Sequence, residues 1–309
     1  MNVKLAYVRR LARAARELAH AVGGTATHGV AGAGRDVFVA ECFDDDPVAS
    51  TYAYASGATV VQVPVERCRG LWFAGFTYVR DGDHPFVRTM SAYAAGDITS
   101  YEASPLRAYY DSWQPASAAA ALGLADAGFV DVAAFRRAPP VAAMAPWWPT
   151  KDLKSFVRTF HASTRRDNAR AGARLAASAG SQLFGPVTAE KGALEFERCV
   201  HAYQSVRQRG FERDATTLDG DVRGQALVRD DGSYTVFILS GQHRVAAAAA
   251  IGLGAIPIRF QHGATVGLRI IRRSDVRHWP AVRSGTFTKV AALAVFDRLF
   301  MGQQPWAHT

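Results

Sequence analysis

The residues best suited to chemistry lie in one short stretch, Ser240-Gly241-Gln242-His243-Arg244. The apolar run before it, residues 235–239, predicts a buried strand, and the alanine-rich run after it, residues 242–251, predicts a helix. The N-terminus of a helix presents unpaired N–H groups and the positive end of the helix dipole. The glycine allows close approach to the backbone, and the histidine and arginine add donors. The stretch therefore predicts an anion site, most naturally for phosphate, although a plain strand-to-helix turn with a surface arginine is the alternative.

The segments on either side of this stretch are expected to position it. Residues 219–225 predict a polar turn, and the pair Asp231-Gly232 predicts the tight turn of a hairpin between strands at 226–229 and 234–239. After the helix, residues 256–260 predict another strand. A hairpin, a helix and a strand therefore follow one another, which indicates a small α/β unit.

Three segments of this region resemble the ParB/sulfiredoxin-like superfamily: Asp221-Val222-Arg223-Gly224-Gln225, the run from Ser240 to Ala247, and Ile256-Pro257-Ile258. The resemblance covers about residues 187–260. It implies a small mixed sheet with helices, and nucleotide phosphates bound at the helix start. Carried over by position, it assigns nucleotide binding to Ser240, Gly241, Gln242, His243, Arg244, Arg223 and Gln225.

Branches of this superfamily bind CTP and DNA, use ATP to phosphorylate a sulfinic acid, or act as free-serine kinases. The sulfiredoxin branch has a catalytic cysteine where this chain has Gln242, so the resemblance does not imply thiol chemistry. The chromosome-partitioning branch has an arginine-rich box at this place and a helix-turn-helix domain, of which no signature stands out here. The histidine–arginine form is most similar to the kinase-type branch.

The function expected from these residues is nucleotide-dependent phosphoryl transfer. Its cofactors would be ATP, or another nucleoside triphosphate, and Mg²⁺, and its acceptor a small-molecule or carbohydrate hydroxyl. Such chemistry needs cations for the developing charge, here His243 and Arg244, and a carboxylate that orients the acceptor. The candidate carboxylates, with the two that we favour first, are Glu195, Asp221, Glu197 and Asp219. An exposed helix face for the glutamates and a turn-forming role for the aspartates are the alternatives.

A second block, residues 84–115, combines aromatic rings with polar groups and is the candidate acceptor site. The residues assigned to the acceptor are His84, Arg88, Tyr101 and Glu102. Aromatic platforms suit sugars, so a glycan acceptor is one expectation. The alternative is a helical hairpin whose aromatic rings are core and whose charges are solvated.

The net charge of +9 favours a polyanionic partner, and the alternative function is a non-enzymatic nucleotide- or DNA-binding protein. Nucleic acid is not favoured, because the basic residues are dispersed. A basic amphipathic helix expected at residues 2–22 allows peripheral membrane contact, with packing on its own domain as the alternative. Three distant cysteines and no apolar run of spanning length indicate a cytoplasmic protein, peripheral at the inner membrane face if that helix binds lipid.

With 309 residues, the chain is long enough for two domains. The predicted fold class is α/β (α+β). We expect an N-terminal α+β domain at residues 1–135, a Pro-rich and then basic linker at 136–184, and the ParB/sulfiredoxin-like domain at 185–309. Residues 151–182 lack a convincing apolar stripe, so an irregular connector is expected there. Further strands are expected at 36–40, 58–63 and 71–79.

Overall fold

A computed structural model describes residues 37–39, 49, 59–125, 132–149, 152–213, 220–260 and 268–306. The helix predicted at residues 2–22 lies outside the described residues, as do Cys42 and Asp219. No helix in the described ranges combines the length and apolar character needed to cross a membrane.

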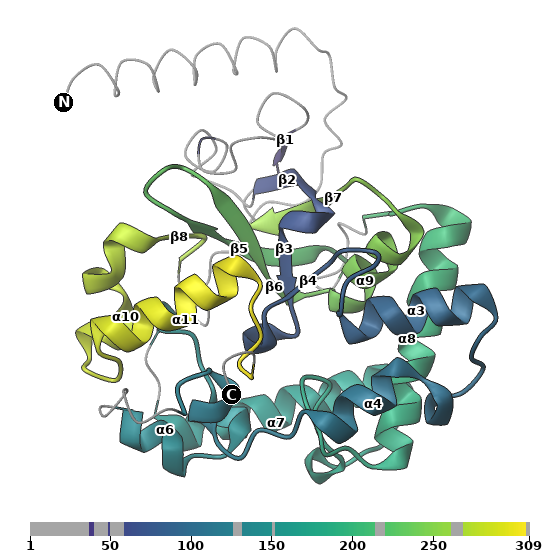
Figure 1. The fold of residues 1–309 in the computed structure, drawn as a ribbon, viewed down its shortest axis with the longest axis horizontal. Coiled ribbons are helices and arrows are strands. Elements are labelled where there is room, and N and C mark those ends of the chain that lie inside the picture. Colours follow the sequence, from purple (N-terminus) through teal and green to yellow (C-terminus); the bar gives the residue numbers. More distant parts are fainter. Residues whose placement is uncertain are drawn as a thin grey trace, which may run out of the picture.

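Strands in the described part of the chain form one mixed sheet, drawn as arrows in Figure 1. Its order is β1-β2-β7-β5-β6-β3-β4, and β8 also pairs with β5. The strands are β1 (Val37–Val39), β2 (Thr59–Pro64), β3 (Cys68–Gly70), β4 (Phe76–Thr77), β5 (Val222–Val228), β6 (Tyr234–Ser240), β7 (Ala255–Phe260) and β8 (Ile270–Arg272). β5 runs antiparallel to β6 and parallel to both β7 and β8. The mixed sheet confirms the predicted α/β (α+β) class.

The sheet crosses the predicted domain boundaries. β2 pairs antiparallel with β7 along its whole length, and β3 pairs parallel with β6. Strands from residues 37–77 and 222–272 therefore share backbone hydrogen bonds in one sheet, on both sides of the expected linker. The candidate site at the end of β6 is built on strands from both parts of the chain.

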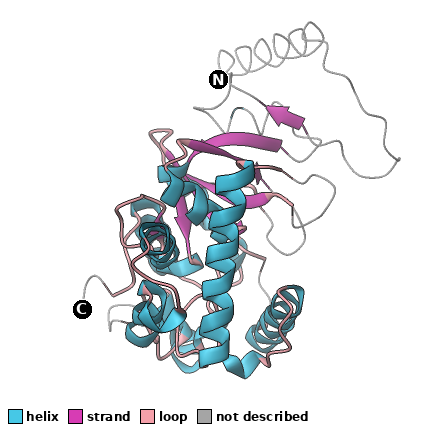
Figure 2. Cartoon of the chain, turned by 90° about the vertical axis from the view of Figure 1, so that its right-hand side faces the viewer, coloured by secondary structure: helices cyan, strands magenta, loops and turns pink. Residues whose placement is uncertain are grey.

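Helices cover both faces of this sheet. The α-helices are α3 (Pro85–Ala95), α4 (Pro105–Ser112), α5 (Ala118–Ala121), α6 (Ala133–Arg137), α7 (Leu153–Arg170), α8 (Ala189–Arg209), α9 (Gln242–Ile251), α10 (Pro280–Arg283) and α11 (Lys289–Met301). Short 3₁₀ helices are η1 (Val65–Arg67), η2 (Trp72–Ala74), η3 (Tyr101–Ala103), η5 (Pro140–Ala142), η6 (Ala177–Ala179) and η7 (Arg273–His278). Figure 1 shows α3, α8 and α9 on one side of β5 and β6, and α10 and α11 on the other. Figure 2 shows the strands at one end of the molecule and most helices below them.

Two hydrophobic cores result, because successive side chains of a strand point to opposite faces. In β6, Val236 and Ile238 join the core under α3, α8 and α9, while Phe237 joins the core formed with α5, α6 and α11. β5 follows the same alternation, with Leu227 in the second core. The end of β6 is therefore held from both faces, which fixes where α9 begins.

Residues 153–170 are the clearest departure from the sequence-based expectation, since they form the helix α7 rather than an irregular connector. Asp152 caps the helix by accepting from the backbone N–H groups of Lys154 and Ser155. Phe156 and Val157 pack against the second core, so an apolar stripe exists in its first half. The apolar stripe does not continue into the second half of α7, so the helical periodicity of residues 153–170 is weak in the sequence.

Two other segments differ in detail from their predictions. Residues 222–228, predicted in part as a polar turn, form β5. The strand predicted at 71–79 is interrupted by η2, because Leu71 and Trp72 have left-handed backbone φ angles of 48° and 45°. This interruption turns Trp72 out of the sheet and into the cleft described below.

Candidate active site

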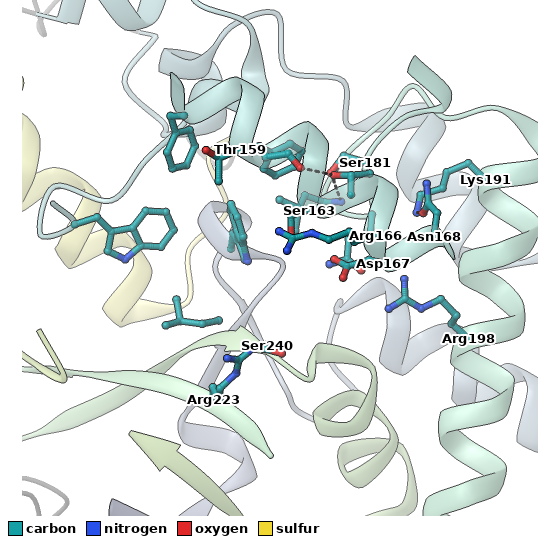
Figure 3. Close-up of a pocket in the computed structure, with 18 of the residues that line it drawn as sticks. Thr159, Ser163, Arg166, Asp167, Asn168, Ser181, Lys191, Arg198, Arg223 and Ser240 are labelled. Carbon is teal, nitrogen blue, oxygen red and sulfur yellow. Dashed lines mark hydrogen bonds between the residues drawn. The ribbon is translucent and has the colours of Figure 1, made fainter. Parts of the chain in front are cut away.

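A cleft lies between α7, α8 and the ends of β5 and β6, and it has two adjoining compartments. The cationic compartment has a volume of about 950 Å³ and reaches the N-terminus of α9. The aromatic compartment has a volume of about 320 Å³ and extends under α7. Both are lined by Trp72, Ser163, Arg166, Asp167, Gln182, Arg198, Arg223, Leu239 and Ser240. Figure 3 shows Arg166 and Asp167 from α7, Arg198 from α8, and Arg223 and Ser240 from the strands around this space.

The predicted phosphate stretch lines the cationic compartment throughout, from Ser240 to Arg244. Gly241 is the N-cap of α9 and has a left-handed φ of 86°. A Cβ at this position would lie 2.9 Å from Val222 Cγ2, so the turn needs glycine for its backbone angle and for its close packing against β5. The N-terminus of α9 therefore opens on the compartment with its positive dipole end.

Arginines from four elements outnumber the acidic residues Asp167 and Glu197 in the lining of this compartment. Among the described residues, those that line it are Arg166 and Arg170 of α7, Arg198 of α8, Arg223 of β5 and Arg244 of α9. Arg244 also donates from Nη1 to the carbonyl oxygen of Gly220 at 2.7 Å, which ties α9 to the segment before β5. Arg223 lies in a strand rather than in the predicted turn. The arrangement suits a ligand with several negative charges.

A histidine and a carboxylate meet at the inner wall of the cationic compartment. His243 Nε2 lies 3.0 Å from Glu195 Oε2, and the Glu195 side chain is fully buried. Burial alone would raise the pKa of Glu195, but His243, Arg198 and Lys191 outweigh it and hold that pKa well below its usual range. Burial and the nearby Arg198 lower the pKa of His243, although Glu195 acts in the opposite direction. The pair therefore consists of an ionised carboxylate and a neutral imidazole near neutral pH.

Glu195 is also held by buried groups on α7 and α8. Lys191 Nζ, on a side chain that is 2% exposed, contacts Glu195 Oε1. The same Nζ donates to Asn168 Oδ1 at 2.7 Å, and Arg198 Nη1 donates to Glu195 Oε1 at 3.1 Å. Asn168 is the buried residue of α7, so this network anchors α7 to α8 and α8 to His243.

Gln242 has a second role that the sequence did not indicate. Its Oε1 accepts a hydrogen bond from the backbone N–H of Leu71, and its side chain is 3% exposed. This bond connects the start of α9 to the left-handed turn that presents Trp72. Gln242 thus lines the cationic compartment and also holds one wall of the aromatic compartment in place.

Asp221 and Gln225, predicted for the phosphoryl-transfer site, lie away from both compartments. Asp221 is 3% exposed and accepts from Arg213 Nε and Nη2 at 2.8 and 3.1 Å. Burial would raise its pKa, but Arg213 and Arg259 lower it. Gln225 is buried in β5, where Oε1 accepts from the indole N–H groups of Trp147 and Trp148. Both side chains therefore stabilise the sheet and do not line the cleft.

The residues predicted to bind the acceptor are not brought together. His84 is buried and caps α3, where Nδ1 accepts from the backbone N–H of Phe86 at 3.2 Å. Phe86 in turn stacks on His243 at 4.4 Å, so His84 supports the site from behind. Arg88 lines a separate surface hollow, Tyr101 is buried against Gly192 of α8, and Glu102 is exposed.

Carboxylates able to bind a divalent cation are few at the cleft. No cluster of three or more metal-ligating side chains occurs among the residues that the structure describes. Mg²⁺ binds nucleotide enzymes through one or two carboxylates and the phosphates themselves, and Asp167 and Glu197 are the carboxylates of the described residues that line the cationic compartment. Asp167 Oδ1 also lies 3.6 Å from Arg170 Nη1.

The cleft residues that sequence reasoning missed come mainly from α7 and from the left-handed turn. Trp72, Trp148, Phe156 and Phe160 line the aromatic compartment, and Arg166 and Arg170 line the cationic one. A signal was present, because Phe156, Phe160 and Ser163 recur at helical spacing. No local sequence pattern predicts that this helix lies over the end of β6.

Comparisons of the chain with protein-family models, with curated proteins and with solved structures found no match. The resemblance to the ParB/sulfiredoxin-like superfamily therefore stays a prediction.

Proposed function

We propose that this protein is a nucleotide-dependent phosphotransferase that binds nucleoside triphosphate phosphates in the cationic compartment. The observation that carries the proposal is the convergence of five arginines on the glycine turn before α9, beside a buried Glu195–His243 pair. A triphosphate carries several charges at neutral pH, and arginine binds phosphate oxygens through paired N–H groups. The strand, turn and helix at Ser240–Gln242 are also the arrangement that the superfamily resemblance implies, which supports the same assignment.

In this proposal, the first turn of α9 and the arginines bind and orient the phosphates. Arg223 and Ser240 sit at the boundary of the two compartments, where a terminal phosphate would meet an acceptor. Mg²⁺, when bound, would neutralise charge on the phosphates, and Asp167 and Glu197 are the carboxylates placed to hold it. The arginines stabilise the negative charge that spreads over the transferred group.

His243 is the proposed general base for the acceptor hydroxyl. Ionised Glu195 beside Nε2 favours the tautomer with its proton on that nitrogen, which leaves the lone pair on Nδ1. A neutral imidazole can accept a proton, and the lowered pKa keeps His243 neutral. Glu195 is then a positioning residue, since its carboxylate acts through the imidazole.

The test is turnover of ATP, CTP, GTP and UTP with Mg²⁺, followed as release of the nucleoside diphosphate. We expect slow turnover of at least one nucleotide by the wild type. His243→Asn should lower that rate by about 100-fold or more, a loss that exceeds any loss of nucleotide affinity. His161→Asn, on α7 but outside both compartments, is the matched control and should keep the wild-type rate.

Three results would count against the proposal. Absence of any binding would refute the phosphate site. Binding without turnover would leave a nucleotide-binding protein without phosphotransferase activity. A salt-sensitive gel shift with DNA, with no response to nucleotides, would instead support nucleic-acid binding.

A further inference from the structure

The aromatic compartment has features of a ligand site that the phosphate assignment leaves unused. Trp72 packs edge-to-face against Trp148 and against Phe160, each at 5.6 Å between ring centroids. With Phe156, these rings come from three separate segments of the chain and surround a space of about 320 Å³. Small-molecule sites typically have such volumes and apolar walls with a few polar groups.

The backbone at Trp72 supports a role for this side chain in binding. Leu71 and Trp72 both have left-handed φ angles, 48° and 45°, which non-glycine residues rarely adopt. Gln242, in the first turn of α9, accepts the Leu71 N–H and so holds this turn. Strained backbone persists where surrounding structure enforces it, and it concentrates at binding and active sites.

A buried asparagine stands behind one wall of the same compartment. Asn168 is fully buried and lines the aromatic compartment. Its Oδ1 accepts from Lys191 Nζ, which fixes the amide orientation. Nδ2 has no hydrogen-bond partner among the residues that the structure describes. Because Nδ2 has almost no accessible surface, Asn168 supports the wall of the compartment through Lys191 and does not meet a ligand directly.

We infer that the aromatic compartment binds the nucleobase of the nucleotide whose phosphates occupy the cationic compartment, an inference that rests on the proposed function. A base has flat π faces that stack on aromatic rings and polar edges that Thr159, Ser163 and Gln182 of the same lining would meet. The two compartments share Arg166, Arg198 and Arg223, so one ligand can extend from the rings to the arginines. Figure 3 shows these arginines around the space between α7 and the strands.

The test compares two ligands that differ in the nucleoside, by calorimetric titration of the full chain. One is the tightest-binding of ATP, CTP, GTP and UTP, and the other is inorganic tripolyphosphate, each with Mg²⁺. The wild type should bind the nucleotide at least about tenfold more tightly than tripolyphosphate. Phe160→Ala and Phe156→Ala, which line only the aromatic compartment, should remove most of this advantage and leave the tripolyphosphate affinity unchanged. Val157→Ala, on α7 outside both compartments, should preserve it.

Each alternative outcome contradicts a separate part of the account. If the wild type binds neither ligand, the proposed function fails and this inference fails with it. If tripolyphosphate binds as tightly as every nucleotide, the phosphate site stands and the base site is refuted. The base site is equally refuted if both aromatic variants keep the full nucleotide advantage. Binding of a hexose that Phe160→Ala abolishes, without a nucleotide advantage, would assign the compartment to an acceptor instead.

Discussion

Glu195 and Glu197, two residues apart on α8, lie in opposite environments. Glu195 is buried among Lys191, Arg198 and His243, whereas Glu197 is exposed at the edge of the cationic compartment. A buried charge that loses its partner is strongly destabilising, because the remaining charge has neither water nor a counter-ion. The chain therefore offers a matched pair of substitutions.

Glu195→Gln should lower the free energy of unfolding by about 3 kcal/mol, because it leaves the Lys191 ammonium buried without its counter-charge. Glu197→Gln should change it by less than about 0.5 kcal/mol. Urea denaturation at pH 7 measures both values. Equal losses in the two variants would show that the buried network contributes no stability.

The buried His84 predicts that stability depends on pH. Burial, followed by the nearby His243, lowers the pKa of His84 to about 3. The unfolded chain, with an ordinary pKa near 6.5, binds this proton more readily than the folded protein does. The contribution of the neutral His84 imidazole to the free energy of unfolding is therefore fully present above about pH 6.5. It is lost progressively as the pH falls toward about 3.

His84→Asn should weaken this dependence, because asparagine retains an N-cap acceptor for α3 but does not titrate. Unfolding free energies at pH 7, 6, 5 and 4 measure the slope. We expect a shallower slope for the variant than for the wild type, with both proteins folded at pH 7. Identical slopes would mean that other groups, such as Glu195 and His243, account for the whole acid sensitivity.

At the scale of elements, the junction of β6 and α9 is the feature that positions the site. Gly241 has a left-handed φ of 86°, and a Cβ there would lie 2.9 Å from Val222 Cγ2. Gly254 lies after α9, and a Cβ at that position would have nothing within 4 Å. Substitution of Gly241 by alanine therefore adds local strain, whereas the same substitution at Gly254 shows the effect of replacing a glycine without such strain.

Gly241→Ala should destabilise the protein by about 1–3 kcal/mol and weaken nucleotide binding, since it strains the turn that presents the first amides of α9. Gly254→Ala should be neutral or slightly stabilising. Thermal unfolding and nucleotide titration of both variants give the comparison. A Gly241→Ala protein with wild-type stability and affinity would show that the turn geometry is not required.

Elements with strong local signals could be predicted from the sequence. The hairpin of β5 and β6, the glycine turn, α9 and β7 follow from apolar runs and turn residues that lie close together in the chain. α7 could not be predicted with the same security, because only half of it has an apolar stripe and Asn168 is its buried residue. The sequence also predicts Asp221 and Gln225 at the site, but their partners Arg213, Trp147 and Trp148 are contacts that only the fold reveals.

At the scale of the whole molecule, one sheet combines strands from distant parts of the chain. β3 lies beside β6, which brings the turn at Leu71 and Trp72 next to the start of α9. This pairing could not be predicted from the sequence, because long-range strand partners leave no local pattern. The cleft is therefore lined by residues from several parts of the chain, including Trp72 and α7, which lie outside the segment 187–260.

The cationic compartment is proposed to bind nucleoside triphosphates, and substitution of Arg166 or of its neighbour Arg165 tests this binding most directly. Both are exposed residues of α7, but only Arg166 lines the cleft. Calorimetric titration should show that Arg166→Ala weakens binding of the Mg²⁺–nucleotide by about tenfold, and that wild-type affinity falls as salt is raised. Arg165→Ala should bind as the wild type does. Equal weakening in both variants, or no binding by the wild type to any nucleoside triphosphate, would contradict the account.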